Sequence, residues 1–389
     1  MFDDCLMLVS CLSLLIWLYL AFARGRFWQT LHFDDSSVPL PEHWPDVCAV
    51  IPARNEAHIL PTTLPTLIQA GYAGGFKIIL VDDRSEDGTA ARAQEIAALH
   101  HASDRVTVIT AASRPAGWKG KVWAMHCGVE HVRASAHAPR YILLTDADIA
   151  YDAGAVSQLV AQAEAEQLVL VTRMVKLHCV SVAERWLIPA FVYFFQMLYP
   201  FSWVNQRHHA MAGAAGGVML TRLEALDKVG GLSAIRDALI DDCALGRLLK
   251  TCGGVQLALT RRIHSMRPYP AFHDIREMVV RTAYDQLRYS PWYLLASMAG
   301  MVLTYLVPLW FAVMGEGLTA IAGTLSYVIM CATFYPMIRY YERSALYCLL
   351  LPLIALCYMV FTMDSAYQFY RGRGGMWKGR IQATDAQTG

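Results

Sequence analysis

Three pairs of aspartates, far apart along the chain, have the residue type and spacing to hold a metal ion and a phosphorylated ligand. They are Asp82-Asp83, Asp146-Ala147-Asp148 and Asp241-Asp242. An Asp-x-Asp pair at the end of a strand can bind a hard divalent ion and leave other positions to water and diphosphate oxygens. Such an ion offsets the charge on a departing diphosphate. Taken alone, each pair could instead cap a loop or a helix, so the surrounding elements decide.

Short apolar runs place the first two pairs at the ends of strands. The runs are rich in β-branched or aromatic residues, a pattern typical of strands buried on both faces, and they span residues 47–52, 76–81 and 141–145. Helix-like stretches follow the strands, so residues 46–149 predict a βαβαβ segment and a mostly parallel sheet. Ligands bind at the carboxyl ends of the strands in an open α/β sheet, which is where both aspartate pairs fall.

The composition indicates a chain with one sizeable domain and membrane segments. It has 389 residues, of which 56% are hydrophobic, and its mean hydropathy is +0.32. These values are too apolar for an ordinary soluble protein but allow one sizeable domain with membrane segments. A net charge of +1 argues against a nucleic-acid partner. The ten cysteines are scattered and form no CxxC pair, as expected of small apolar residues in a reducing compartment.

An N-terminal anchor is predicted over residues 1–26. Residues 5–23 are uncharged and about as long as the roughly 20 residues that cross a bilayer. Arg24 and Arg26 follow, so the positive-inside rule places the next loop, and the aspartate pairs with it, in the cytoplasm of a multi-pass inner-membrane protein. A signal peptide is the alternative, but the preceding aspartates are wrong for its n-region.

A C-terminal membrane bundle is predicted over residues 292–363. Three apolar stretches, at residues 292–314, 318–338 and 345–363, are separated by short polar turns. Three crossings would leave the basic tail, residues 364–389, outside, against the positive-inside rule. Either one stretch is re-entrant or the rule fails here.

One more apolar run, residues 186–204, contains eight aromatic residues and has basic flanks. A single crossing at this position would put Asp148 and Asp242 on opposite sides of the bilayer. We therefore expect an interfacial helix at about 184–204, since aromatic residues with basic flanks suit the headgroup boundary. A buried core helix is the alternative.

Five motifs occur in the order found in family 2 glycosyltransferases. They are residues 51–56 (IPARNE), 81–89 (VDDRSEDGT), 117–121 (GWKGK), the Asp-x-Asp and the later Asp241-Asp242. The chain resembles this inverting, GT-A fold family, and within it the membrane-bound, hopanoid-associated glycosyltransferases, which are distantly similar to ceramide glucosyltransferases. The resemblance covers roughly residues 46–289. It implies a Rossmann-like α/β catalytic domain of the GT-A fold over residues 46–290.

The resemblance also implies roles for individual residues. Asp148 falls where the family ligates Mg²⁺ or Mn²⁺. Glu56 could instead be an ordinary charge at a helix N-terminus, and Lys121 a solvated lysine. The residues implied to contact the nucleotide-sugar, including the donor phosphates, are Pro52, Glu56, Asp83, Lys121 and Asp146.

Asp242 is the expected general base. A lipid hydroxyl is a poor nucleophile until a carboxylate within hydrogen-bond reach can accept its proton, and the second acid of the third pair does this in the family. Asp241 should raise the proton affinity of the pair if both are partly buried. Alternatively, the two acids cap a helix over residues 243–251, which could coexist with catalysis. The glycine-rich residues 212–218 either admit a ligand to the backbone or allow close packing.

Residues 285–289 (DQLRY) depart from a family motif. Related transferases often have Gln or Arg, two residues, then Arg-Trp, whereas this chain has Asp285 first and Tyr289 last. Arg288 can still pair with a diphosphate and Tyr289 can still stack at the acceptor entrance, so Asp241, Gln286, Arg288 and Tyr289 are candidate acceptor or diphosphate contacts. The departure argues against a processive polysaccharide synthase.

The expected function is transfer of one sugar from a nucleoside diphosphate donor, expected to be a UDP-sugar, to a membrane lipid alcohol. Mg²⁺ or Mn²⁺ would assist, and the anomeric carbon would be inverted. A hopanoid or polyisoprenoid acceptor follows from the resemblance alone. The alternatives are transfer to a polyprenyl phosphate, which needs no strong base, and a non-catalytic membrane scaffold that retains the fold.

Overall fold

The computed structural model describes residues 2–34 and 38–375, and these form two compact units. The helical unit contains residues 2–30, 179–202 and 269–375, and the sheet unit contains residues 31–34, 38–178 and 203–268. Residues 179–202 and 269–290, expected within the catalytic domain, thus cluster with the apolar helices. Residues 376–389 of the expected basic tail lie outside the described residues.

A mixed sheet forms the centre of the sheet unit, with the order β3-β2-β1-β4-β7-β6-β8-β5 in the part of the chain that is described. Its strands are β1 (Val47–Ala53), β2 (Phe76–Asp82), β3 (Val106–Thr110), β4 (Tyr141–Thr145), β5 (Ile149–Tyr151), β6 (Leu168–Lys176), β7 (Val218–Arg222) and β8 (Gly254–Ser265). Strands β3, β2, β1 and β4 are parallel, whereas β7 is antiparallel to both β4 and β6. The expected α/β sheet is confirmed.

Within residues 46–145 the sequence analysis missed one strand, and it named none of the later strands β5 to β8. The chain runs β1-α2-β2-α3-β3-α4-β4 where βαβαβ was predicted. The missed strand β3 lies at the edge of the sheet, and Val106 is the one buried residue among its five. An edge strand exposed to solvent lacks the continuous apolar run by which the buried strands were recognised. The connecting helices are α2 (Leu60–Ile68), α3 (Thr89–Leu99) and α4 (Gly120–Arg133).

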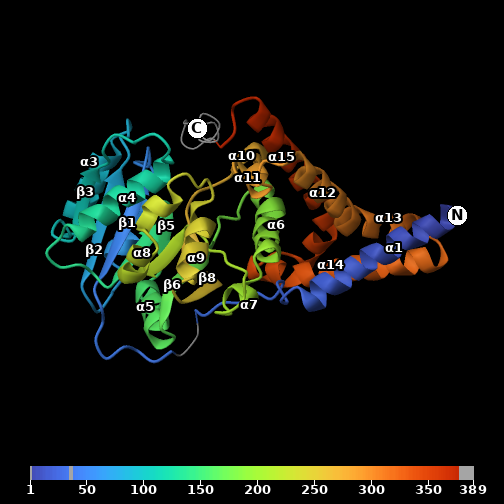
Figure 1. Cartoon of the computed structure of the whole chain (residues 1–389), viewed down its shortest axis with the longest axis horizontal. Coiled ribbons are helices and arrows are strands. Elements are labelled where there is room, and N and C mark those ends of the chain that lie inside the picture. The colour runs from blue at the N-terminus through green and yellow to red at the C-terminus, as the bar shows by residue number, and fades with distance from the viewer. Residues whose placement is uncertain (1, 35–37, 376–389) are drawn as a thin grey trace. The chain divides into compact units, whose positions relative to one another are not determined.

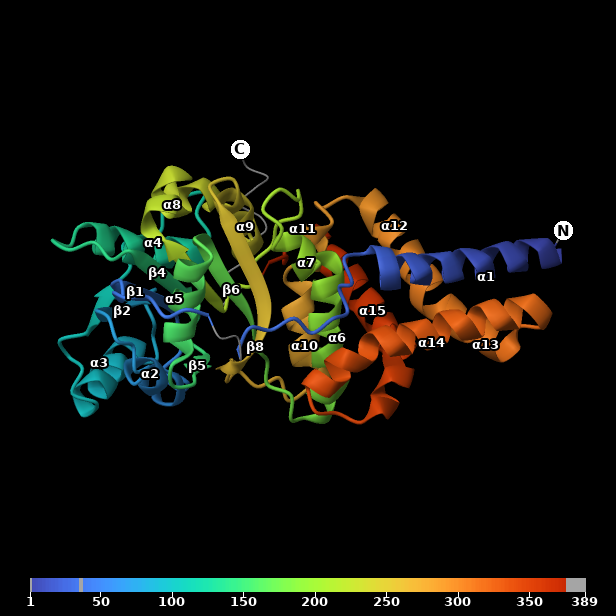
Figure 2. The ribbon, with the colours of Figure 1, turned by 90° about the horizontal axis from the view of Figure 1, so that it is seen from below.

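Helices cover both faces of the sheet because alternate strand side chains point in opposite directions. Residues of α2, α3 and α5 (Ala155–Ala165) share one core with strand residues such as Ala49 and Ile51. Helix α4 packs against the other face, where Gly128 comes so close that an added Cβ would lie 2.4 Å from Val50 Cγ1. Figure 2 shows α4 on one side of β1 and β2, and α2 and α3 on the other.

The helical unit consists of apolar helices from three parts of the chain. They are α1 (Phe2–Leu18), α6 (Val182–Leu198), α10 (Phe272–Val280), α11 (Ala283–Gln286), α12 (Pro291–Met301), α13 (Val307–Met314), α14 (Gly317–Tyr340) and α15 (Leu351–Tyr370). Helix α1 runs beside α14 (Figure 1). A π-helical segment, Val302–Leu306, joins α12 to α13, and the Trp17 indole donates a hydrogen bond of 2.6 Å to its Thr304 carbonyl.

Five helices among the described residues are long and apolar enough to cross a membrane: Asp3–Ala23, Val182–Val204, Pro291–Met314, Gly317–Tyr340 and Ala345–Tyr370. Several expose large apolar side chains. Leu8 is 69% exposed, Phe22 73% and Trp292 78%. Apolar surface of this extent on neighbouring helices is typical of contact with lipid.

Helix α6 is more deeply buried than the interfacial helix expected at this position requires. Leu187, Tyr193 and Gln196 are fully buried within the helical unit. The Tyr193 hydroxyl hydrogen-bonds to Thr333 Oγ1 of α14 at 2.9 Å. The helix begins at a capping box in which Ser181 Oγ accepts from the Glu184 amide and the Glu184 carboxylate accepts from the Ser181 amide.

The short elements of the sheet unit complete the surroundings of β7 and β8. Helix α7 (Phe201–Val204) follows α6, helix α8 (Leu223–Lys228) follows β7, and helix α9 (Asp241–Lys250) precedes β8. Asp241 and Asp242 therefore form the first turn of α9.

Candidate active site

The loops after β1 and β2 are bound to each other by hydrogen bonds. The Asn55 amide donates to Ser85 Oγ at 3.0 Å, and the Glu56 amide donates to Thr89 Oγ1 at 2.9 Å. Asn55 and Arg84 adopt left-handed backbone conformations, with φ of 53° and 55°, which turn each chain sharply at the strand end. The two motifs therefore form one loop pair at the carboxyl edge of the sheet.

Asp83 lies buried beneath this loop pair. It is 2% exposed and Arg54 is 8% exposed. Arg54 Nη1 donates to the Asp83 carbonyl at 2.6 Å and lies 3.7 Å from Asp83 Oδ2. Asp82 accepts a hydrogen bond from the Ser85 amide. Asp82 therefore shapes the turn, while Asp83 holds a charge that Arg54 compensates.

Lys121 joins the Asp-x-Asp pair to the third aspartate pair. Its Nζ lies 2.8 Å from Asp146 Oδ1 and 3.6 Å from Asp241 Oδ2. Burial acts to lower the pKa of Lys121, but the carboxylates of Asp146, Asp241 and Asp242 outweigh it and hold the pKa above its usual value. Lys121 is therefore a charged link between segments about 100 residues apart, not a solvated side chain.

Asp242 is held by two backbone amides. Gly216 N donates to Oδ2 and Cys243 N donates to Oδ1, both at 2.7 Å. Burial and the charge of Asp241 raise the pKa of Asp242 to about 6, although Lys121 and the two amides oppose the rise. The predicted effect of Asp241 is thus confirmed. The Asp242 carboxylate therefore binds an amide in the first turn of its own helix, α9, and also an amide of the glycine-rich segment.

Gly216 makes this approach possible because it has no side chain. A Cβ at this position would lie 3.1 Å from Asp242 Oδ2 and 3.3 Å from Lys121 Nζ. Residues 212–218 were expected either to admit a ligand to the backbone or to allow close packing. Gly216 allows close packing, and the groups that pack against it are the charged side chains of the site.

Asp148 is bound from the end of β8. Ser265 Oγ and Arg267 Nε donate to Asp148 Oδ2 at 3.1 and 3.0 Å. Arg267 Nη2 also lies 2.8 Å from Glu56 Oε1, so one guanidinium bridges the loop after β1 and the Asp-x-Asp. The pairing of β5 with β8, which places Ile149 opposite Ser265, brings these residues together.

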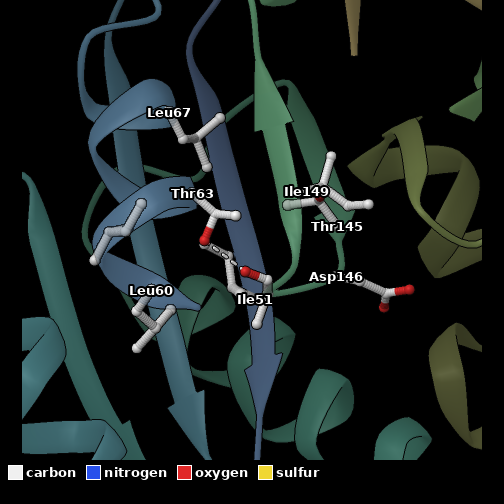
Figure 3. Close-up of a pocket in the computed structure, with 9 residues that line it drawn as sticks. Ile51, Leu60, Thr63, Leu67, Thr145, Asp146 and Ile149 are labelled. Carbon is white, nitrogen blue, oxygen red and sulfur yellow. Dashed lines mark hydrogen bonds between the residues drawn. The ribbon is translucent and has the colours of Figure 1, made fainter. Parts of the chain in front are cut away.

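Asp146 points away from the apolar core, towards Lys121. Its backbone borders a small cavity of about 10 Å³, which is lined mainly by apolar side chains such as Leu60, Leu67 and Ile149. Figure 3 shows the Asp146 carboxylate directed away from this space, while Thr63 hydrogen-bonds across it to the Ala147 carbonyl. Burial raises the pKa of Asp146, and the nearby Asp148 charge adds to the rise against the opposing charge of Lys121.

The site carries more negative than positive groups. Three cations, Arg54, Lys121 and Arg267, interact with six carboxylates, which are Glu56, Asp83, Asp146, Asp148, Asp241 and Asp242. When all are ionised, three negative charges remain. Such a surplus of hard oxygen ligands suits a divalent cation.

The residues present fit Mg²⁺ or Mn²⁺ held jointly with a diphosphate. In the described part of the chain, no cluster of three or more His, Cys, Asp or Glu side chains could cage an ion by itself. Asp146 uses Oδ1 to bind Lys121, and Asp148 uses Oδ2 to bind Arg267. One or two carboxylates completed by substrate phosphates and water is the arrangement that Mg²⁺ commonly adopts.

The remaining predicted residues fall in two places. Pro52 is buried in β1, in register with Val81. Gln286, Arg288 and Tyr289 belong to the helical unit. The Gln286 side-chain amide hydrogen-bonds to the Tyr199 hydroxyl, and the Tyr289 ring stacks on Phe369 with centroids 4.5 Å apart.

Sequence reasoning missed Arg54, Ser265, Arg267 and the role of Gly216. Arg54 lies inside a quoted motif, so its position beside Glu56 was an available signal. Ser265 ends strand β8 and Arg267 follows it, and the partner strand β5 is more than 100 residues earlier. No local pattern around Arg267 indicates that pairing.

Comparison with known proteins shows what part of the chain is similar to. Residues 48–230 match the family described as Glycosyl transferase family 2. No curated protein matches the sequence. Among solved structures, the mannosyltransferase PcManGT from Pyrobaculum calidifontis, in complex with GDP-Man and Mn²⁺, is similar with 16% identity and a TM-score of 0.57. The alignment covers 92% of this chain and 99% of that chain.

Two further structures have lower TM-scores. Mannosyl-3-phosphoglycerate synthase from Rubrobacter xylanophilus is 18% identical with a TM-score of 0.37, over 63% of this chain and 74% of that one. GalNAc-T7 with UDP, GalNAc and Mn²⁺ is 16% identical with a TM-score of 0.39, over 62% of this chain and 48% of that one. The likeness to PcManGT shows that the fold is of the GT-A type.

Proposed function

We propose that this chain, of which residues 48–230 match Glycosyl transferase family 2, transfers one sugar from a nucleoside diphosphate donor to the hydroxyl of a membrane lipid. The observation that carries the proposal is the position of Lys121. Its Nζ contacts Asp146 of the Asp-x-Asp and Asp241 of the third pair. The acids for binding the donor and for activating the acceptor therefore belong to one charged network.

The donor would bind at the carboxyl edge of β1, β2 and β4. Glu56, Asp83 and Pro52 would contact the nucleoside, and Lys121 and Asp146 would lie beside the diphosphate. A divalent ion at Asp148 and Asp146 would offset the charge of the leaving diphosphate as a Lewis acid. Mn²⁺ and GDP-Man occur together in the PcManGT complex, which supports this assignment. The sugar and base of the donor are left open by these residues.

Asp242 would act as the general base. The carboxylate accepts the proton of the acceptor hydroxyl while the new C–O bond forms at the anomeric carbon and the bond to the diphosphate breaks. A pKa of about 6 leaves Asp242 mostly ionised at neutral pH and yet more basic than an ordinary aspartate. A single displacement of this kind inverts the anomeric carbon. The amides of Gly216 and Cys243 fix the carboxylate before the acceptor arrives.

The apolar helices support a lipid acceptor in this proposal. Five are long enough to cross a membrane, and Leu8, Phe22 and Trp292 expose most of their apolar side chains. The chain leaves the sheet unit at residue 178 and re-enters it at residue 203. Residues 179–202 thus connect two segments of the sheet unit along the sequence.

The membrane side and the lipid class are finer parts of the proposal. Arg24 and Arg26 follow the first apolar helix, which supports a sheet unit in the cytoplasm of a multi-pass inner-membrane protein. A hopanoid acceptor is supported by sequence resemblance alone. The candidate contacts in the helical unit, Gln286, Arg288 and Tyr289, would serve this acceptor or the leaving diphosphate.

The direct test is to identify the product. The purified full chain in detergent is incubated with Mn²⁺, a panel of labelled UDP- and GDP-sugars and a lipid extract, and the lipids are analysed by mass spectrometry. We expect one lipid to gain a single hexose-type sugar with inverted anomeric configuration. Sugar on a polyprenyl phosphate would replace the lipid-alcohol proposal, and labelled water-soluble products alone would refute it.

A further inference from the structure

Arg267 forms an ion pair with Asp148, the residue that would ligate the divalent ion in the proposed function. Its Nε lies 3.0 Å from Asp148 Oδ2, and its Nη2 lies 2.8 Å from Glu56 Oε1. Both carboxylates are nearly buried, at 8% and 5% exposure. Charge-assisted contacts of this length are among the stronger hydrogen bonds in proteins, because both partners are ionised.

The contact is fixed by the backbone, not by a freely placed side chain. The Met266 amide donates to the Asp148 carbonyl at 2.8 Å, and Ser265 Oγ binds the same carboxylate oxygen as Arg267. Strands β5 and β8 pair directly beside these residues. The backbone at the end of β8 is therefore held against the Asp-x-Asp. This fixes the backbone position from which the Arg267 side chain extends.

The protein's own cations thus engage one oxygen of each aspartate in the Asp-x-Asp. Arg267 binds Asp148 Oδ2 and Lys121 binds Asp146 Oδ1. A divalent ion at these carboxylates would lie within several ångströms of a guanidinium, and like charges at that distance repel strongly in a partly buried site. A nucleoside diphosphate brings negative charge that would compensate both cations.

We propose that Arg267 is a resident counter-ion of Asp148 that disfavours binding of the divalent ion until the donor diphosphate arrives. This inference rests on the proposed function. Arg267 is a positioning residue in this scheme, since it acts through Asp148 and Glu56. Its consequence is an order of binding: the free protein holds the metal weakly, and the diphosphate and the metal enter together.

The experiment measures Mn²⁺ binding to the purified full chain by electron paramagnetic resonance, with and without UDP or GDP. The wild type should bind Mn²⁺ weakly alone and tightly with a nucleotide. Arg267→Gln should bind Mn²⁺ alone about tenfold more tightly, because the repelling charge is gone. Arg267→Lys keeps the charge and should remain weak. Arg262→Gln is the matched control, because Arg262 contacts Ala153 and Gln158 instead.

The outcomes separate this inference from the proposed function. Equal or weaker binding of Mn²⁺ alone by Arg267→Gln, compared with the wild type, would overturn the counter-ion role while nucleotide binding remained intact. Tight binding of Mn²⁺ by the nucleotide-free wild type would overturn it as well. Failure of the wild type to bind either nucleotide with Mn²⁺ would defeat the proposed function and the inference together. Circular dichroism of each variant checks that the fold is retained.

Discussion

At the scale of residues, the site is organised by cations that each join carboxylates from distant segments. Lys121 links Asp146 to Asp241, and Arg267 links Glu56 to Asp148. Removing one member of a fully buried ion pair leaves an uncompensated charge and typically costs about 3–5 kcal/mol. The pairs of this site are partly buried, so the cost has the same sign and is smaller. The charged groups therefore hold the loops in place as well as providing ligands.

Substitution of the base tests the residue assignment. Asp242→Asn removes the proton acceptor but keeps the size of the side chain and its contact with Cys243. We expect transfer to fall by about 10²–10⁴-fold, the usual contribution of a general base, with nucleotide affinity nearly unchanged. Asp237→Asn is the control, since Asp237 is exposed and lies five positions away. Full turnover by Asp242→Asn would instead favour a phosphate acceptor, which needs no strong base.

The raised pKa of Asp242 predicts the dependence of the rate on pH. Asp242 accepts a proton only in its ionised form, and its pKa is about 6. The value of kcat/KM should therefore be level above pH 7 and fall about tenfold for each pH unit below 6. Nucleotide binding measured over the same range separates this effect from protonation of Asp146. A rate that stays level below pH 5 would contradict the assignment.

At the scale of elements, the glycine-rich segment before β7 sets the distance between α4 and α9. Gly216 donates to Asp242 on α9 and lies against Lys121 on α4. An added Cβ there would require these charged groups to shift by a few tenths of an ångström. The elements thus converge closely because one position carries no Cβ.

Gly216→Val should disrupt this convergence. Its Cβ would lie 3.1 Å from Asp242 Oδ2 before the branched methyl groups are added, so we expect kcat to fall by at least about tenfold, as for misplaced catalytic groups. Gly216→Ala should lose less. Gly300→Ala is the control, because an added Cβ there meets no atom within 4 Å. Equal activity of Gly216→Val and the wild type would show that the site does not depend on this approach.

Of the eight strands in the described sheet, the sequence predicted three, β1, β2 and β4. Strands β1, β2 and β4 were recognised because they are continuous apolar runs buried on both faces. Edge strand β3 was missed because its pattern is mostly exposed. Arg267 was missed because its position depends on β5 pairing with β8, a contact that only the folded chain creates. Ser265 and Arg267 lie outside every quoted motif, whereas Arg54 lies inside one and was still overlooked.

At the scale of the whole molecule, the helical unit gives the chain its membrane character. Its five long apolar helices expose side chains such as Leu8 and Trp292, which water would not favour. An α-helix satisfies most of its backbone hydrogen bonds within its own segment, as a membrane-spanning element must.

Membrane integration can be tested by extraction. We expect the full chain to stay in the membrane pellet after washes with high salt and then alkaline carbonate, and to be released only by detergent, because insertion of several helices is effectively irreversible. A peripheral protein from the same membranes serves as the control for the washes. Release of the chain by carbonate would contradict membrane-spanning helices and leave only surface attachment.

The central claim is that Asp148, Lys121 and Asp242 surround one donor site. The most direct measurement is a crystal structure with Mn²⁺ and a nucleoside diphosphate, with the ion located by its anomalous signal. We predict the Mn²⁺ peak at the carboxylates of Asp148 and Asp146, with the diphosphate between that ion and Lys121, on the side that Asp242 faces. A peak away from Asp148, or a diphosphate out of reach of Lys121, would contradict the account.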